Sequence, residues 1–234
     1  HAAWLLWIGP ISASASPAPP TLIFPASNAV NVGHSPPLMV RVAEPANGPL
    51  TVRCFGRLAR SPGPDFTLVA LPDSQYYTAN RFGGVAAMFV AQADWIVTNR
   101  TAWNIAYVAH LGDIVDHGDT NGGPSNLTEW RNTTNALYRL ENPLSTQLAD
   151  GIPYGLAVGN HDQSPNGVTA GTTTYYNQFF GVSRFSGRSY YGGHYGTNND
   201  NHFDLFSASG LDFIAICLEY DTNATPAVLH WAGD

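Results

Sequence analysis

The chain has 234 residues, of which 44% are hydrophobic and only 12% are charged. Its formal net charge of −7 argues against a nucleic-acid-binding surface, which needs a basic face. Its modest net charge and 12% aromatic content argue against intrinsic disorder, and two Cys are too few for a disulfide scaffold. The composition therefore indicates an acidic globular protein and leaves its function open.

The first 20 residues resemble the end of a secretion signal. Residues 1–11 are apolar apart from His1, and residues 13–15 (ASA) match the small-x-small pattern before a signal-peptidase site. Residues 16–20 (SPAPP) would be a Pro-rich spacer. No stretch of the chain is long and apolar enough to predict a membrane span. We therefore expect a secreted, periplasmic or extracellular protein, with a stray hydrophobic N-terminus as the alternative interpretation.

Residues 21–60 predict a small all-β module. Residues 38–42 and 50–55 alternate apolar and polar side chains at a period of two, and residues 44–48 (EPANG) are turn formers between them. About 40 residues are too few for a complete immunoglobulin-type sandwich, so a partial one is expected. Residues 58–65 would be the linker that follows it.

Residues 66–234 predict an α/β domain with a mostly parallel sheet, because strands and helices alternate along it. Residues 163–200 are rich in Gly, Asn, Tyr and Thr, which predicts a long loop region. A hairpin is expected from residues 202–206 and 211–220, and a last helix after the capping pair Thr225 and Pro226. That helix stops after about two turns, which we interpret as a truncated chain. The earlier strands are expected at residues 66–73, 104–111 and 154–158, and the earlier helices at 85–98 and 126–141.

Each of the three earlier strands is followed by residues of types that can bind metals. The segments that follow the strands are 72–75 (PDSQ), 112–118 (GDIVDHG) and 159–162 (GNHD). The loops beyond the carboxyl ends of parallel strands converge on one crevice, so residues distant in sequence can meet there. Carboxylates, amide oxygens and imidazoles suit a divalent ion such as Mn²⁺, Fe or Zn²⁺. Each cluster alone also fits an ordinary turn, but the three together favour a functional site.

The order D-x-Q, GDxxD and GNHD resembles the calcineurin-like metallophosphoesterases, over about residues 66–234. The preceding β module is similar to the short immunoglobulin-like segment of some secreted bacterial members. The resemblance implies a layered β-sheet/helix fold, here incomplete, with two divalent metal ions. It implies hydrolysis of a small-molecule or polymeric phosphate monoester or diester, and it leaves the metal and the substrate open.

The resemblance assigns a role to each matching residue. Asp73 and Gln75 would belong to the first metal site, Asp113 would bridge the two metals, and Asn160 would bind the second. His161 would contact the phosphate or protonate the leaving group.

Four further residues are candidates for the expected site. Asp162 would act with His161 by orienting its ring. Asp116 would be a supporting residue, and His117 is a candidate for substrate contact, as is His194 in the expected loop. So many carboxylates in one cleft are costly without cations, which supports a metal site independently of the resemblance.

Two departures from the family pattern bear on activity. Gln75 is a neutral and weaker ligand than the His found in many members. The family also completes its site with a further His and a later G-H-x-H motif. No G-H-x-H occurs in this sequence, and the remaining His residues do not match the family pattern. We therefore expect this chain to be inactive or weakly active alone. The alternative is a secreted binding or structural module on a non-catalytic phosphoesterase scaffold.

The remaining His and Cys residues are expected to be structural. His110, His202 and His230 lie in or beside strand and helix patterns. Cys54 and Cys217 fall in strand patterns of different modules, which indicates buried thiols and no bridge between them.

Overall fold

The structure is a computed structural model that describes residues 4–10, 20–26, 37–43, 50–56, 63–118, 124–165, 168 and 171–234. The chain divides into two compact units, His1–Ser61 and Pro62–Asp234. It is a mixed α/β protein, as expected. Within the described residues, no helix has the length and apolar character that crossing a membrane requires.

The first unit is built from two antiparallel strand pairs. β1 (Trp4–Pro10) pairs with β4 (Leu50–Gly56), and β2 (Thr21–Phe24) pairs with β3 (Met39–Arg41). The predicted strands at 38–42 and 50–55 are therefore confirmed, but they belong to different pairs. The turn residues 44–48 lie outside the described part of the chain. Residues 4–10, which we interpreted as part of a secretion signal, form a strand here.

The second unit is centred on a parallel sheet of three strands in the order β5-β6-β7. These strands are β5 (Thr67–Leu71), β6 (Ile105–His110) and β7 (Tyr154–Leu156). The central strand β6 is buried or half-buried along its whole length. An apolar run suits this position because both faces of the strand are covered. The three predicted strands and the parallel pairing are confirmed.

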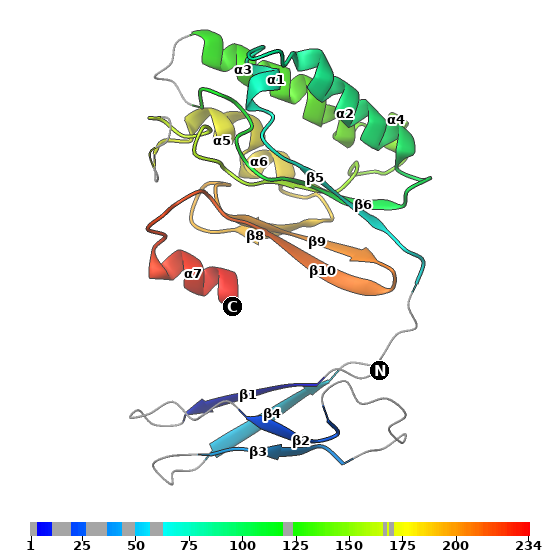
Figure 1. The fold of residues 1–234 in the computed structure, drawn as a ribbon, viewed down its shortest axis with the longest axis vertical. Helices are drawn as coiled ribbons and strands as arrows, with labels where there is room; N and C mark the ends of the chain where they lie inside the picture. The colour runs from blue at the N-terminus through cyan, green and yellow to red at the C-terminus, as the bar shows by residue number, and fades with distance from the viewer. Residues whose placement is uncertain are drawn as a thin grey trace. The chain divides into compact units, whose positions relative to one another are not determined.

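Helices α2 (Ala86–Asn99) and α3 (Pro124–Leu137) lie on one side of this sheet (Figure 1). The buried side chains of α2 are Phe89, Ala93 and Ile96, a spacing that places one stripe of the helix against the core. The helices predicted at 85–98 and 126–141 are confirmed, although the second ends as the 3-10 turn η2 (Tyr138–Glu141). Two short helices, α1 (Gln75–Thr78) and α4 (Pro143–Thr146), lie in the connections.

A second, antiparallel sheet lies on the other side of the parallel sheet (Figure 1). Its strands, in the order β10-β9-β8, are β8 (Tyr191–His194), β9 (His202–Ala208) and β10 (Leu211–Cys217). The ring of Tyr107 on β6 stacks on that of Phe206 on β9, with centroids 4.9 Å apart, and so joins the two sheets. The predicted hairpin is confirmed. Its turn lies at Ser209 and Gly210, both with positive φ.

The expectation of one long loop over residues 163–200 is wrong. This stretch forms α5 (Thr174–Phe180), α6 (Val182–Phe185) and strand β8. Its abundant Gly and Asn suggested a loop, but the aromatic side chains of Tyr176, Phe180 and Phe185 are almost fully buried. Burying this apolar area outweighs the weak helix and strand propensities of the stretch.

The last helix, α7 (Pro226–Gly233), begins as predicted. The Thr225 hydroxyl oxygen accepts a hydrogen bond from the Val228 N–H at 3.4 Å, and Pro226 occupies the first helical position. The ring of Trp231 contacts the rings of Tyr195 and Phe203, which attaches α7 to the second sheet.

Candidate functional site

The three predicted motifs meet beyond the carboxyl ends of β5, β6 and β7, with Asp113 at their junction. The Gln75 N–H donates to the Asp113 carbonyl oxygen at 2.9 Å, which ties the loop after β5 to the loop after β6. The His161 N–H donates to Asp113 Oδ1 at 3.0 Å, which ties the loop after β7 to the same residue. The structure therefore brings Gln75, Asp113 and His161 together.

Two glycines allow the loops to approach this closely. Gly112 has a φ of +100° and Asp113 a φ of +51°, so the chain turns through the left-handed region directly after β6. A Cβ atom on Gly159 would lie 2.2 Å from both the N and the Oδ1 atoms of Asp113. Residue 159 must therefore be glycine if Asp113 is to keep its place.

His110, at the end of β6, links the loop after β5 to the loop after β6 through its two ring nitrogens. Its Nε2 atom lies 2.9 Å from Ser74 Oγ, and its Nδ1 atom accepts from the Gly112 N–H at 3.3 Å. Ser74 Oγ donates its own proton to the Ile114 carbonyl at 2.9 Å, so the proton between Ser74 and His110 sits on Nε2. Burial lowers the pKa of His110 to about 3, so the ring is neutral. The structural role expected for His110 fits this geometry.

Asp162 binds the backbone of the loops, where we had expected it to orient His161. Its Oδ1 atom accepts from the N–H groups of Ile114 and Val115, at 2.8 and 3.0 Å, and its Oδ2 atom accepts from the Gly159 N–H at 2.7 Å. Burial raises the pKa of Asp162 to about 7, against the opposing effect of these hydrogen bonds. Asp162 therefore fastens the loop after β7 to the loop after β6.

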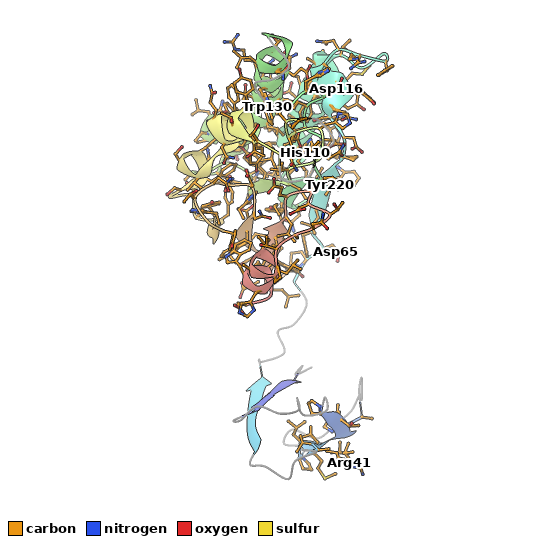
Figure 2. The ribbon with its side chains drawn as sticks, turned by 90° about the vertical axis from the view of Figure 1, so that its left-hand side faces the viewer. Arg41, Asp65, His110, Asp116, Trp130 and Tyr220 are labelled. Carbon is orange, nitrogen blue, oxygen red and sulfur yellow. The ribbon has the colours of Figure 1, made fainter. Side chains whose placement is uncertain are left out.

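The carboxylate that faces His161 is that of Asp116, the residue we expected to be only supporting (Figure 2 marks Asp116 and His110). His161 Nδ1 lies 3.1 Å from the Asp116 carbonyl oxygen and 3.3 Å from its Oδ1 atom. Both oxygens are acceptors, so Nδ1 carries a proton. The guanidinium of Arg81 donates to Asp116 Oδ2, and only 5% of the Asp116 side chain is exposed. Asp116 thus fixes the orientation of the His161 ring.

Glu129 of α3 holds His117, the residue that follows Asp116. Its Nδ1 atom lies 2.9 Å from Glu129 Oε1, while Glu129 Oε2 accepts from the N–H groups of Asp116 and His117, both at 2.9 Å. The side chain of His117 is 41% exposed, so one part of the ring faces solvent beside the site. This arrangement is compatible with the expected contact between His117 and substrate.

Glu129 and Arg81 are functional candidates outside the motifs, and Ser74 lies within the first motif but was assigned no role. A signal for Glu129 was present in α3, where the polar residues Asn126, Glu129 and Thr133 form a stripe at helical spacing and all are buried. Buried polar stripes indicate hydrogen-bonded partners within the protein. Arg81 and Ser74 carry no such pattern, because their partners are determined only by how the loops fold together.

The other predicted metal ligands lie in the loops that follow β5 and β7. Asp73 is exposed and has a φ of +37°, and Asn160 is half-buried. Gln75 is only 8% exposed, and its Oε1 atom has no hydrogen-bond partner. A buried carbonyl oxygen without a donor is costly, and a cation would satisfy it. Asp73, Asp113, Gln75 and Asn160 offer two carboxylates and two amide oxygens. This is the donor set of an oxygen-preferring divalent ion, so these residues fit the metal ions that the resemblance implies.

His194, which we expected in a loop near substrate, lies in β8. It pairs with His202 across the antiparallel sheet. Residues 191–194 therefore form a strand in place of the expected loop, and substrate contact by His194 stays a prediction.

A cleft of about 480 Å³ lies elsewhere on this unit. It is lined by residues that include Ala106 at the start of β6, Pro153 just before β7, and Phe206 on β9. Ala106 and Pro153 mark the amino ends of the parallel strands, whereas the loops joined at Asp113 follow the carboxyl ends. The cleft is therefore separate from the candidate site.

A buried group on the second sheet could hold a metal ion. His202, Asp204 and Cys217 each place a ligand atom within 4.8 Å of the others. Among the residues that the structure describes, this is the one group of three or more His, Cys, Asp or Glu side chains arranged in this way. Cys217 is a buried free thiol, as expected. The side chain of Cys54 lies outside the described part of the structure.

Comparison with known proteins gives one relative without an assigned activity. The chain is 34% identical over 151 residues to a protein of Bacillus subtilis (strain 168) named "Uncharacterized protein YvnB". The match covers 64% of this chain and 10% of that protein, so the chain spans about a tenth of the length of this relative. No protein-family model matches the chain. No solved structure matches it.

Proposed function

We propose that residues 62–234 belong to a metal-dependent phosphoesterase domain of the calcineurin-like type, which hydrolyses phosphate monoesters or diesters. The observation that carries the proposal is the junction at Asp113. Loops that contain D-x-Q, GDxxD and GNHD follow three adjacent parallel strands, and the residues Gln75 and His161 both bond to Asp113.

The residues that would hold two divalent ions are Asp73, Gln75, Asp113 and Asn160. Such ions, when bound, draw charge from phosphate oxygens and lower the pKa of water enough to supply hydroxide near neutral pH. The unpartnered Oε1 atom of Gln75 supports a cation on the first-motif side of the junction. The oxygen-rich donor set favours Mn²⁺ or Fe over Zn²⁺.

His161 would bind the phosphate or donate a proton to the departing oxygen. Asp116 accepts from Nδ1 of His161 and limits rotation of the ring. Arg81 offsets the charge of Asp116 and adds a partly exposed cation beside the site, where an anionic substrate would approach. His117, held by Glu129, would contribute a second imidazole at the substrate side.

We also propose that the protein is secreted. Secretion rests on the apolar start of the chain and the small residues at 13–15.

Hydrolysis assays test the proposal directly. The protein, loaded with Mn²⁺, is assayed on p-nitrophenyl phosphate and on bis(p-nitrophenyl) phosphate, beside Asp113→Asn. The Asn side chain keeps an oxygen that can accept from the His161 N–H, so the loops can stay joined while the charge is lost. We expect slow turnover that requires the metal and that Asp113→Asn abolishes. Metal binding without turnover would support the non-catalytic scaffold instead, and unchanged turnover in Asp113→Asn would refute the site.

A further inference from the structure

The buried group His202, Asp204 and Cys217 lies on one face of the second sheet. His202 and Cys217 are direct cross-strand partners in the β9–β10 pairing, and Asp204 is two residues further along β9. Cross-strand partners and residues two apart on a strand point to the same side of a sheet. His202 is 1% exposed, Asp204 is fully buried and Cys217 is 8% exposed.

Two acceptor atoms in this group have no partner. The Nδ1 atom of His202 lies 2.9 Å from the Asn199 carbonyl oxygen, which can only accept, so Nδ1 carries the proton and Nε2 holds a lone pair. That Nε2 atom is buried and has no hydrogen-bond partner, and the same is true of Asp204 Oδ1. Unpaired buried acceptors are costly, and two of them in one buried group require an explanation.

The surroundings orient the carboxylate. The Tyr107 hydroxyl donates to Asp204 Oδ2 at 2.7 Å, which leaves Oδ1 as the oxygen without a donor. Gly155 of β7 closes the group on another side, because a Cβ atom there would lie 2.3 Å from the Tyr107 hydroxyl, 2.5 Å from Asp204 Oδ2 and 2.9 Å from Cys217 Sγ. A hydrogen bond to the outer oxygen of a ligating carboxylate is a usual support for a metal site.

We propose that His202, Asp204 and Cys217 bind one divalent transition-metal ion, with Zn²⁺ as the best match. Imidazole nitrogen, thiolate sulfur and carboxylate oxygen are the three ligand types of protein zinc sites. At the usual bond lengths of about 2.0–2.3 Å, tetrahedral ligands lie about 3.3–3.8 Å apart. The three ligand atoms lie within 4.8 Å of one another, so binding of the ion would draw them closer together.

Charge also favours a divalent ion. A thiolate and a carboxylate together carry two negative charges, which a divalent cation cancels within a buried group. Because a thiolate and not a thiol is the metal ligand, binding of the ion would release the thiol proton of Cys217.

The expected consequence is structural. The ion would join β9 and β10 to each other, and Asp204 would connect it through Tyr107 to β6 of the parallel sheet. This site is separate from the junction at Asp113, which contains no Cys, and it does not depend on the proposed hydrolysis.

Cobalt substitution tests the proposal. The protein is unfolded, refolded with Co²⁺ so that entry to a buried site is no barrier, and examined for the charge-transfer absorption that only a cobalt–thiolate bond gives. The two Cys of the chain provide a matched pair of variants, Cys217→Ser and Cys54→Ser. We expect one thiolate-bound Co²⁺ per chain in the natural protein and in Cys54→Ser, displacement of Co²⁺ by Zn²⁺, and no thiolate band in Cys217→Ser.

A second readout does not depend on variants that fold poorly. Metal analysis of the natural protein should find about one equivalent of Zn²⁺ that resists brief chelation, and stripping it should lower Tm. Absence of the thiolate band from the natural protein at saturating Co²⁺ would overturn the proposal. So would a band that survives Cys217→Ser in a folded protein and is lost in Cys54→Ser.

Discussion

The Nδ1 atom of His161 lies 3.1 Å from the carbonyl oxygen of Asp116 and 3.3 Å from its carboxylate. Asp116 is buried, and Arg81 holds its other carboxylate oxygen. The second Asp of the GDxxD motif thus orients the His of the GNHD motif. The neighbouring Asp162 is instead fully engaged with three backbone N–H groups.

This relationship predicts that Asp116→Asn reduces kcat more than it changes metal binding. The amide cannot reproduce the charged acceptor, so the His161 ring is held less firmly, and losses of about 10–100-fold are usual for such supporting groups. The measurement is kcat and KM across pH, together with Mn²⁺ affinity. Asp94→Asn is the matched control, because the ion pair of Asp94 with Arg139 is exposed. Equal kcat in Asp116→Asn and the control would contradict the positioning role.

Gly159→Ala should disrupt the junction without removing any ligand. Its Cβ atom would lie 2.2 Å from Asp113 Oδ1, so Asp113 or the loop after β7 must move. We expect metal affinity to fall at least tenfold, measured by titration with Mn²⁺. Gly233→Ala is the control, since nothing lies within 4 Å of a Cβ atom there. A Gly159→Ala protein with the affinity of the natural chain would show that the close approach is not needed.

Trp130→Ala should be strongly destabilising. Trp130 is fully buried, its ring contacts those of Tyr176 and Phe180, and its indole N–H donates to the Gly118 carbonyl. Removing a buried Trp costs about 3–5 kcal/mol of unfolding free energy. Urea unfolding followed by far-ultraviolet circular dichroism measures this. Trp103→Ala should cost much less, because Trp103 is 56% exposed. Similar losses for both variants would be inconsistent with a core organised around α3.

His110 should make the fold sensitive to acid. Its contacts are the Ser74 hydroxyl, the Gly112 N–H and the ring of Phe89, none of them charged. Burial lowers its pKa from 6.5 to about 3, so between these pH values the unfolded chain binds one more proton than the folded chain. The contribution of the neutral His110 ring to the free energy of unfolding is complete above about pH 6.5 and is lost as pH falls toward about 3.

Unfolding free energies measured from about pH 7 down to about pH 4 test this. The slope with pH should be shallower in His110→Gln than in the natural protein, whereas His230→Gln, with an exposed imidazole, should leave the slope unchanged. Identical slopes for all three proteins would mean that His110 does not contribute.

The parts of the fold that the sequence predicted are those with a strong local signal. The run at 105–110 is apolar because both faces of the strand are covered, and the spacing of Phe89, Ala93 and Ile96 reflects one buried helix face. The run at 67–71 is equally apolar and forms β5, although Leu68 and Ala70 are exposed there. Residues 174–194 were missed because their Gly and Asn content gives a local loop signal. Their order depends on aromatic packing against distant elements.

The site was predictable in outline and not in its contacts. The three motifs could be placed at one sheet edge because parallel strands end together. Which carboxylate faces His161 is decided by the turn at Gly112 and the close approach of Gly159, which no spacing rule contains. The group of His202 and Cys217 was missed because the two residues meet only through the register of the hairpin.

The most direct test of the metal site at Asp113 is a Mn²⁺ titration followed by electron paramagnetic resonance, in which only the free aqueous ion gives the full signal. It is carried out in a Cys217→Ser background, so that the group on the second sheet does not contribute a thiolate ligand. We predict Mn²⁺ binding that is weakened at least tenfold by Asp113→Asn and is unaffected by Asp94→Asn. Equal binding by all three proteins, or none by any of them, would contradict a cation site at the junction of the three loops.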